Sequence, residues 1–365
     1  MRIGWATVDW SQSFADETGQ PAPGGSGWYR CHLPAQALAK LGHTTFVGRP
    51  VLVDKSTANP RYVIADMKID REPTPDEMHE VDVVVFQRCM HRAFADDLKE
   101  IEDRRTQLIV NDVDDNFWQL DRRNHAYKMS LRGERPDNNI WTYLEFLQLS
   151  DVVTVSTPYL AEYLGAYGCN TQLVRNGVDL DRWHSKNTMP GESPVLGWVG
   201  ALPWRSGDIE TLRRPLRLIE QTAARFYHGG HIEGAATFAD KAGLRSAVMT
   251  APMTTPMDVH RLYFPIDVGI VPLNQIPFNE AKSFIKGLEY AASGIPFVAQ
   301  STGEYDLLAE GGIGEVARND RQWSGKLKSL LFDPEAYTES REKARANLAQ
   351  HDISKRAVEW QSVFR

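Results

Sequence analysis

The sequence predicts an α/β protein with two domains, each built around a parallel β-sheet. Apolar runs of strand length alternate with longer segments of helical period, and this pattern is typical of βαβ units. The alternation stops at a polar stretch, Leu180–Ser193, and then begins again. The 365 residues also exceed what one hydrophobic core usually organises. We therefore expect two Rossmann-like halves joined near residues 180–193.

Strands in the first half are expected at short apolar runs, separated by segments in which apolar residues recur at helical spacing. These strands are Arg2–Val8, Thr44–Gly48, Asp82–Gln87, Gln107–Asn111, Asp151–Ser156 and Thr171–Arg175. The helices are Tyr29–Leu41, Ala93–Asp103, Ile140–Leu149 and Pro158–Tyr167. The segment Ala15–Ser26 is rich in glycine and proline, so it is expected to be a mobile loop.

The second half repeats the pattern and ends in helices with no strand between them. Its strands are Val195–Val199, Ala224–Tyr227, Val248–Ala251, Asp267–Val271, Pro296–Gln300 and Ile313–Val316. The terminal helices are Gln322–Leu331, Pro334–Leu348 and Ile353–Phe364. This order predicts an N-terminal domain over residues 1–178 and a C-terminal domain over residues 194–350. The last helix, within residues 351–365, is a candidate to return to the first domain.

Charge and cysteine content limit the classes of function. The chain has 41 Lys+Arg against 48 Asp+Glu, and its net charge of −7 argues against binding nucleic acid or an anionic membrane over the whole surface. Cys31, Cys89 and Cys169 lie too far apart for a disulfide framework or a paired zinc site. The N-terminus lacks the apolar core of a signal peptide, and no transmembrane run occurs. We expect a cytoplasmic protein without stable membrane association.

The segment Asp267–Gln300 carries the clearest indication of a ligand. After a buried strand and a loop, Lys282 and Ser283 are expected to open a helix, with Ser283 as its cap. Free N–H groups at such a helix start, its dipole and the Lys282 charge together favour a diphosphate. Glu289, about two turns further along, can accept paired hydrogen bonds from vicinal ribose hydroxyls. Alternatively, both lysines are solvated and Glu289 only pairs with Lys286 at i−3.

This segment resembles the nucleotide-sugar-binding segment of retaining glycosyltransferases of the two-Rossmann GT-B type, the group 1 or family 4-like enzymes. The matching residues are Asp267, Pro272, Lys282, Ser283, Lys286, Glu289, Tyr290, Gly294 and Pro296. Further matches follow in the same order along nearly the whole chain. They are Gly24–Arg30 with Leu33-Pro34 and Gly42-His43, then Thr154–Thr157, Asn176–Asp179 and Gly197–Gly200. Their collinearity over roughly residues 1–300 makes the resemblance specific.

The resemblance implies two Rossmann-like domains that face each other across a cleft, with the nucleotide-sugar donor held by the C-terminal domain. It assigns the diphosphate to the helix start and the donor ribose to the following glutamate. The residues that match these donor-binding positions are Lys282, Ser283, Lys286 and Glu289. The family usually carries a Glu-x7-Glu pair whose first carboxylate contacts the donor sugar. Here that position is Ala281, so either Glu280 substitutes for it or backbone groups around residues 279–282 hold the sugar.

Two further stretches are expected to contact the donor. Gly25 and Gly27 permit φ > 0 and a close approach of backbone to phosphate or sugar, with a flexible surface loop as the alternative. These glycines lie too far beyond the first strand for a dinucleotide fingerprint. Arg30 follows them near the start of a helix and is a candidate to face the cleft and bind the donor. Family members carry a basic residue after the first strand of the C-terminal domain. Arg205 is the best match, because a guanidinium binds phosphate oxygens bidentately.

Several carboxylates of Asn111–Asn116 follow the strand Gln107–Asn111. Such a cluster can bind Mg²⁺ or Mn²⁺ or can cap a turn, but the resembling enzymes neutralise the diphosphate with basic groups, so no metal cofactor is expected. Our hypothesis is that Asp112 or Asp114 orients the acceptor hydroxyl. His91, ranked above His125, is a candidate to polarise a group near the sugar.

Together these observations predict a metal-independent retaining glycosyltransferase. It would move a sugar from a nucleoside-diphosphate sugar to a hydroxyl of a soluble glycan, a protein or a small molecule, with no cofactor. Three alternatives stay open on the same fold: hydrolysis or epimerisation of the nucleotide sugar, nucleotide-sugar binding without catalysis, and glycosylation of modified DNA bases. The net charge disfavours nucleic acid as the partner.

Overall fold

The computed structural model describes residues 1–15, 21–67, 72–124, 127, 139–205 and 207–365. Contacts between Cα atoms divide the chain into two compact units. Unit 1 consists of Met1–Gln119, Tyr127–Asn176 and Ile353–Arg365, and unit 2 consists of Leu120–Ala126 and Gly177–Asp352. The last helix of the chain therefore belongs to the unit formed by the first half of the sequence.

Unit 1 contains an eight-stranded sheet with the strand order β10-β9-β8-β7-β1-β4-β5-β6. Its strands are β1 (Arg2–Thr7), β4 (Thr44–Val53), β5 (Arg61–Ala65), β6 (Met78–Glu80), β7 (Val83–Gln87), β8 (Leu108–Val113), β9 (Val152–Val155) and β10 (Thr171–Leu173). The strands from β10 to β4 pair in parallel, and β5 and β6 extend one edge in antiparallel pairing. Every residue of β7 is buried, as expected for a parallel strand covered on both faces.

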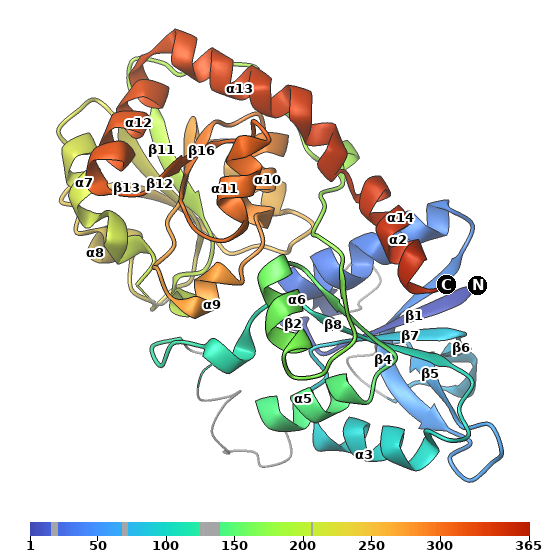
Figure 1. Cartoon of the computed structure of the whole chain (residues 1–365). Coiled ribbons are helices and arrows are strands. Elements are labelled where there is room, and N and C mark those ends of the chain that lie inside the picture. Colours follow the sequence, from blue (N-terminus) through green and yellow to red (C-terminus); the bar gives the residue numbers. More distant parts are fainter. Residues whose placement is uncertain (16–20, 68–71, 125–126, 128–138, 206) are drawn as a thin grey trace. The chain divides into compact units, whose positions relative to one another are not determined.

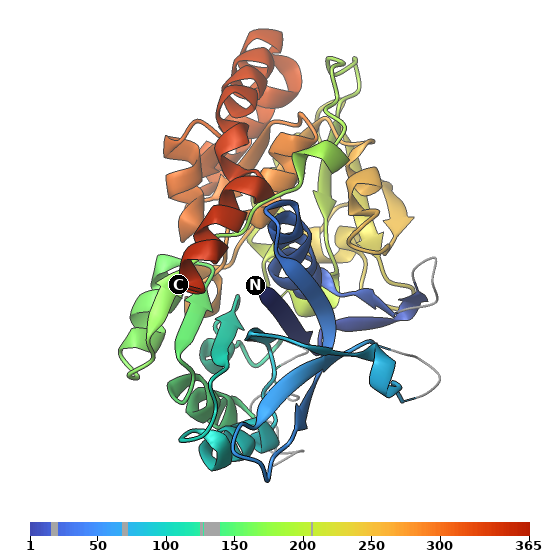
Figure 2. The same cartoon turned by 90° about the vertical axis from the view of Figure 1, so that its right-hand side faces the viewer.

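Helices cover both faces of this sheet (Figures 1 and 2). On one face, a helix that runs from α1 (Gly25–Gly27) through a π-helical turn (Trp28–His32) to α2 (Leu33–Lys40) lies beside α14 (Ile353–Val363). Trp5 and Trp360 pack edge to face there, with ring centroids 6.2 Å apart. On the other face, α3 (Arg92–Ile101) and α5 (Ile140–Gln148) enclose a core around Phe86. Helix α6 (Pro158–Gly165) connects β9 to β10.

Unit 2 contains a six-stranded parallel sheet with the order β13-β12-β11-β14-β15-β16. Its strands are β11 (Val195–Val199), β12 (Arg225–His231), β13 (Val248–Pro252), β14 (Val268–Val271), β15 (Phe297–Gln300) and β16 (Glu315–Ala317). Its helices are α7 (Arg213–Ile219), α8 (Phe238–Ala242), α9 (Pro277–Glu280), α10 (Ile285–Ala292), α11 (Glu304–Glu310), α12 (Asp320–Phe332) and α13 (Pro334–Leu348).

The two faces of the unit 2 sheet pack differently. One face carries a large apolar core to which Trp198, Phe226 and Trp323 contribute. On the opposite face, helix α10 lies close enough to β14 that only glycine fits at position 269. A Cβ atom on Gly269 would lie 2.4 Å from the ring of Tyr290. This close packing fixes α10, and therefore Glu289, against the sheet.

The structure confirms all the strands predicted above and, in the part of the chain that it describes, adds four that the sequence analysis missed. Two of these form a hairpin, β2 (Trp10–Ala15) with β3 (Pro21–Pro23), and the other two are the antiparallel strands β5 and β6. The predicted loop Ala15–Ser26 is therefore wrong in part, because β3 and the start of α1 lie within it. Residues 16–20 of that segment lie outside the described residues.

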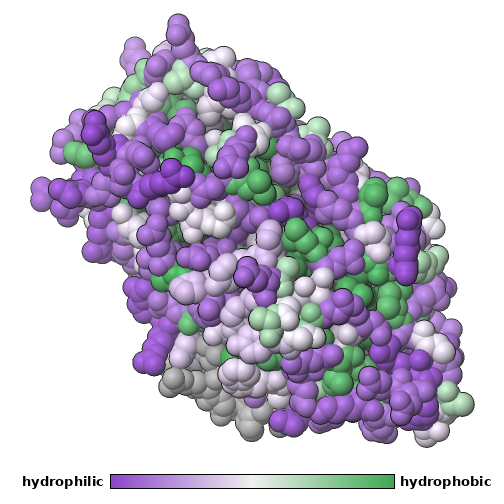
Figure 3. Space-filling view, viewed as in Figure 1, coloured by the Kyte–Doolittle hydropathy of each residue, from purple (hydrophilic) through white to green (hydrophobic). Residues whose placement is uncertain are grey.

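Hydrophilic side chains dominate the face of the molecule shown in Figure 3. Some large apolar residues are exposed, and those such as Trp141 and Trp204 are far apart in the sequence. Within the described ranges, no helix combines the length and the apolar character needed to cross a membrane.

Candidate functional site

The strand order of unit 2 changes direction between β11 and β14. From β11 the chain continues to β12 on one side, whereas β14 lies on the other side. In open α/β sheets, ligands bind in the crevice outside the carboxyl ends of the strands at such a switch point. The loops that follow these two strands, residues 200–208 and 272–284, are therefore the walls of the candidate site. Both carry residues that the sequence analysis selected.

A buried carboxylate joins these two loops. Asp208 is only 2% exposed, and its Oδ1 accepts hydrogen bonds from the backbone N–H of Asn274 at 2.9 Å and from the side-chain amide of Asn279 at 2.7 Å. The Asn279 amide also donates to the Asn274 carbonyl at 2.8 Å. Because a buried carboxylate is costly without partners, these bonds fix the loops relative to each other. The sequence analysis did not predict this role, since the partners lie 66 and 71 residues away.

Helix α10 begins later than predicted. Its first helical residue is Ile285 and its N-cap is Phe284, which makes no side-chain capping bond, so the expectation that Ser283 caps the helix is wrong. Phe284 is buried with its ring against His351, and its carbonyl accepts from the N–H groups of Gly287 and Leu288. Burial of this ring sets where the helix starts. Lys282 and Ser283 lie half-buried in the turn just before the helix. The first backbone N–H groups of any α-helix have no acceptor within the helix, and this turn directly precedes those of α10.

Lys282 and the neighbouring alanine have defined surroundings. The Lys282 Nζ lies 4.3 Å from the centroid of the Phe278 ring, in cation–π geometry. Ala281 is fully buried, whereas Glu280 is exposed at the end of α9. Gly303, which follows β15, approaches this turn so closely that a Cβ atom there would lie 2.7 Å from the Glu280 carbonyl oxygen. The loop after β15 thus packs directly against the turn from Glu280 to Lys282. Contact of Glu280 or of the nearby backbone with a sugar stays a prediction.

Glu289 belongs to a buried polar group of three. Its Oε2 accepts hydrogen bonds from the Tyr263 hydroxyl and from the Lys286 ammonium, both at 2.5 Å, and Lys286 also donates to the Tyr263 hydroxyl oxygen at 3.0 Å. Glu289 is 3% exposed and Tyr263 is fully buried. The Lys286–Glu289 ion pair, which the sequence analysis kept as an alternative, is therefore present. Tyr263 was missed.

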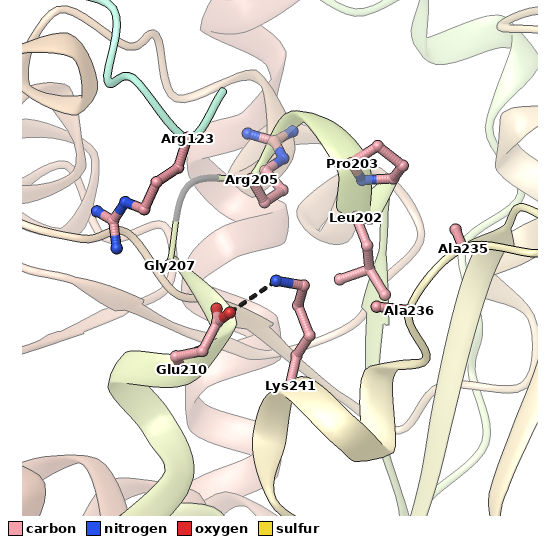
Figure 4. A pocket seen from close by; sticks show the side chains of 9 residues that line it. All are labelled: Arg123, Leu202, Pro203, Arg205, Gly207, Glu210, Ala235, Ala236 and Lys241. Carbon is pink, nitrogen blue, oxygen red and sulfur yellow. Dashed lines mark hydrogen bonds and ion pairs between the residues drawn. The ribbon is translucent and has the colours of Figure 1, made fainter. Parts of the chain in front are cut away.

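Arg205 lines a pocket of about 290 Å³ in unit 2 (Figure 4). The pocket also includes Arg123, Glu210 and Lys241, and the last two form an ion pair at 2.7 Å. In Figure 4 the Arg205 guanidinium points away from this pair. Its Nε is buried and has no hydrogen-bond partner among the described residues. The Nε–H group of Arg205, in the loop after β11, can therefore donate a hydrogen bond to a bound anion.

Arg30 and Asp112 form a buried ion pair in unit 1. Asp112 also accepts a bond from the Thr154 hydroxyl, and Arg30 donates to the Val174 carbonyl and the Asn176 side chain. Burial acts to lower the pKa of Arg30, but the charge of Asp112 outweighs it and raises this pKa. With exposures of 1% and 0%, both side chains are buried and paired with each other in this structure. The roles expected from the sequence, donor binding by Arg30 and orientation of the acceptor by Asp112, therefore stay predictions.

Asp114 stays close to the surface of unit 1. Its carboxylate oxygens accept two bonds from Arg88, both at 3.0 Å, and Arg88 also bonds to Asp115. Burial would raise the pKa of Asp114, but the Arg88 charge and a hydrogen bond from Ser26 outweigh this and hold the pKa below its ordinary value. Arg88 adopts φ = 58°, a strained conformation for a residue with a side chain. Asp114 is thus a fixed anion next to the glycine-rich run.

The glycine-rich run opens the first helix instead of forming a loop. Neither Gly25 nor Gly27 has a positive φ, so the predicted reason for these glycines is wrong. Gly27 instead allows a close approach of Asp9. Its N–H donates to the Asp9 carboxylate at 2.9 Å, and a Cβ atom there would lie 2.7 Å from the Asp9 carbonyl oxygen. Gly25 has open space where a Cβ would be. An acidic side chain therefore already occupies this helix start.

The two histidine predictions have different outcomes. His91 is exposed and caps α3, because its Nδ1 accepts from the N–H of Ala93 at 3.1 Å. Its other ring nitrogen therefore carries the proton when the ring is neutral. His125 lies outside the described residues. In the parts of the chain that the structure describes, no three His, Cys, Asp or Glu side chains gather to hold a metal ion.

Comparisons with known proteins agree with this architecture, although no protein-family model matches the sequence. TuaH of Bacillus subtilis strain 168, described provisionally as a teichuronic acid biosynthesis glycosyltransferase, is 25% identical over 188 residues. That match covers 48% of this chain and 47% of TuaH, so the aligned part is about half of the curated relative.

Solved structures are similar over the whole chain. Sucrose-phosphate synthase from Thermosynechococcus elongatus has a TM-score of 0.66 at 14% identity, covering 100% of this chain and 98% of its own. HepE from Anabaena, solved with UDP-glucose, has a TM-score of 0.63 at 15% identity, covering 100% of both chains. These likenesses confirm the fold class that the sequence predicted: two Rossmann-like units of the GT-B type, resembling group 1 glycosyltransferases.

Proposed function

We propose that this chain, which has the GT-B fold, transfers a sugar from a nucleoside-diphosphate sugar to a hydroxyl acceptor with retention of configuration. One observation carries the proposal most directly. At the switch point of unit 2, the turn at Lys282 precedes helix α10, which holds Glu289 in a buried polar group. The proposal is supported by the similarity in sequence to TuaH, which is described as a glycosyltransferase, and by the similarity in fold to HepE, which was solved with UDP-glucose.

The donor would be bound by its two polar parts. The first N–H groups of α10, the Lys282 ammonium and the Arg205 guanidinium would hold the diphosphate, and Glu289 would accept hydrogen bonds from the ribose. Transfer then depends on stabilising the charge that develops on the departing diphosphate. Helix dipole and basic side chains supply this stabilisation from groups that are already oriented. Transfer by these groups would proceed without a divalent ion.

The acceptor would be oriented by unit 1. Asp114 is the residue best suited to accept a hydrogen bond from an incoming hydroxyl, because Arg88 and Ser26 hold it in its ionised form. A carboxylate with a lowered pKa is a weak base, so the role of Asp114 would be to orient the hydroxyl and not to remove its proton. His91, which is exposed and caps the start of α3, is the second candidate on this unit. The acceptor is expected to be a soluble glycan, a protein or a small molecule, met in the cytoplasm.

Turnover tests the proposal. We would incubate the protein in EDTA with UDP-, GDP-, ADP- and TDP-sugars and a panel of hydroxyl acceptors, and follow release of the nucleoside diphosphate. Formation of a glycoside with the anomeric configuration of the donor is the predicted result, read by proton NMR. Free sugar or an epimer without any acceptor would instead identify a hydrolase or an epimerase.

A second candidate function has one specific observation in its favour. The position where the family usually carries a sugar-contacting glutamate is the buried Ala281, whose side chain is too small and too enclosed to contact a sugar. A nucleotide-sugar-binding protein without catalysis would tolerate this change. It predicts donor binding with no turnover on any acceptor.

A further inference from the structure

Tyr263 contacts the carboxylate that the proposed function assigns to the donor ribose. It ends a short 3₁₀ turn, Val259–Tyr263, that precedes β14 and belongs to a different element from Glu289. Its hydroxyl donates to Glu289 Oε2 at 2.5 Å and accepts from the Lys286 Nζ at 3.0 Å. The contact joins residues 26 positions apart, so no local pattern in the sequence indicates it.

The ring of Tyr263 is held rigidly. It packs edge to face against Trp183, with centroids 5.4 Å apart, and against Tyr290, with centroids 5.1 Å apart. Because the residue is fully buried between these rings, its hydroxyl is a fixed donor. The other partner of Glu289, Lys286, lies on the same helix and has a long, flexible stem. The direction of the carboxylate is therefore set by the tyrosine from outside the helix.

Paired recognition of vicinal hydroxyls needs a carboxylate in one orientation. A glutamate side chain has several rotatable bonds, and ordering them on binding costs free energy. A partner that has already ordered the side chain removes that cost, which is how supporting hydrogen bonds raise the affinity of a site. Two donors on Oε2 fix one end of the carboxylate and so determine where the other oxygen lies.

We infer that Tyr263 is a positioning residue of the donor site, which orients Glu289 for the two hydroxyls of a ribose. The inference rests on the proposed function, and it names the ligand class more narrowly: a ribonucleoside diphosphate in preference to its 2′-deoxy counterpart. Tyr263 itself touches no substrate. Its removal should weaken binding and reduce the preference for ribose together.

The test measures two affinities by calorimetry, for UDP and for 2′-deoxy-UDP, in EDTA. Wild type is expected to favour UDP. In Tyr263→Phe, which removes one oxygen and keeps the ring, UDP affinity should fall by about tenfold, the loss expected for a hydrogen bond to a charged group. The affinity ratio between the two nucleotides should fall as well. GDP and ADP with their 2′-deoxy counterparts are measured in the same way, in case the base is not uracil.

Tyr290→Phe is the matched control. Tyr290 is also a buried tyrosine of unit 2, but its hydroxyl donates to the carbonyls of Gly197 and Ile270 and not to Glu289. Its removal should lower the unfolding temperature and leave the ratio of affinities unchanged. Glu289→Gln supplies the second comparison. Because Tyr263 acts through Glu289, adding Tyr263→Phe to Glu289→Gln should produce no further loss of affinity.

The outcomes separate this inference from the proposed function. Wild-type affinity and ratio in Tyr263→Phe, together with weakened binding in Glu289→Gln, would overturn the positioning role and leave the donor site standing. Equal loss in Tyr263→Phe and Tyr290→Phe would show a packing effect and would also overturn it. If Glu289→Gln binds every nucleotide as wild type does, the donor site itself is misassigned and the inference fails with it.

Discussion

The guanidinium of Arg30 and the carboxylate of Asp112 form a bidentate ion pair inside unit 1, with Nε–Oδ2 and Nη2–Oδ1 distances of 3.0 and 2.5 Å. The pair joins the first helix to the end of β8. The π-helical turn at Trp28–His32 contains Arg30, whose guanidinium also lies 5.2 Å from the Trp360 ring of α14. This pair therefore links three elements of unit 1 in a region where the resemblance predicts substrate contacts.

Breaking this pair on one side should destabilise unit 1. Asp112→Asn leaves the Arg30 charge buried without its counterion, and we expect a loss of about 3–5 kcal/mol in unfolding free energy. Urea unfolding, with hydrogen exchange of unit 1 amides to assign the transition, measures the loss. Nucleotide binding by unit 2 should persist below the transition. A stable variant that has lost glycosyl transfer alone would instead return Asp112 to the acceptor site.

The stability contributed by Asp114 should depend on pH. Its folded-state pKa lies below the ordinary value of 3.8, so the native state holds fewer protons than the unfolded state in acid. The contribution is therefore present above about pH 4 and is lost as the pH falls through the folded pKa. Asp114→Asn should be less stable than wild type at pH 7 by about 1–3 kcal/mol, with a smaller difference near pH 3. Thermal unfolding across this range tests it, and a difference independent of pH would contradict it.

Asp208 should affect donor affinity without touching the donor. In Asp208→Ala, the backbone N–H of Asn274 and the side-chain amide of Asn279 both lose their shared acceptor Oδ1, so the two loops at the switch point are no longer joined. Nucleoside diphosphate affinity should fall by about tenfold. Asp306→Ala is the control, since the Asp306 carboxylate is more exposed and bonds to Ser301 and Arg318, away from both loops. Equal effects of both variants would contradict a specific role for Asp208.

Lys282 should act on the phosphates and not on the nucleoside. Lys282→Met keeps an apolar stem over the Phe278 ring but removes the charge. The affinity for UDP should fall by about five- to tenfold, and the affinity for uridine should not change. Lys326→Met removes a charge of α12 that pairs with Glu315 of β16, and it should change neither affinity. The contradicting result is an equal loss for UDP and for uridine.

Buried strands were the most predictable part of the fold. Strands such as β7 and β14 are covered on both faces, so their residues form the continuous apolar runs from which they were predicted. Strand β6 has only three residues and pairs at the edge of the sheet in antiparallel register, so it produces no such run. The start of α10 was misplaced because Ser283 has the chemistry of a cap, whereas burial of the Phe284 ring determines where the helix begins.

The candidate site was predictable in its local parts only. Lys282 and Glu289 were selected from the order of strand, turn and helix, and the structure places Lys282 in the loop after β14 and Glu289 within α10. Asp208 and Tyr263 were not predicted, because each bonds to a partner far along the chain. Hydrogen bonds between residues distant in sequence produce no periodic pattern. The same reason hid the burial of Arg30 against Asp112, 82 residues away.

The most direct measurement is calorimetric titration of wild type and Glu289→Ala with UDP, GDP, ADP and TDP in EDTA. We predict that wild type binds one of these nucleotides without metal and that Glu289→Ala loses most of the affinity. Absence of binding by all four, or binding that requires Mg²⁺ and is unchanged in Glu289→Ala, would contradict the donor site. In that case the carboxylates of Asp114 and Asp115 become the next candidates for the donor site.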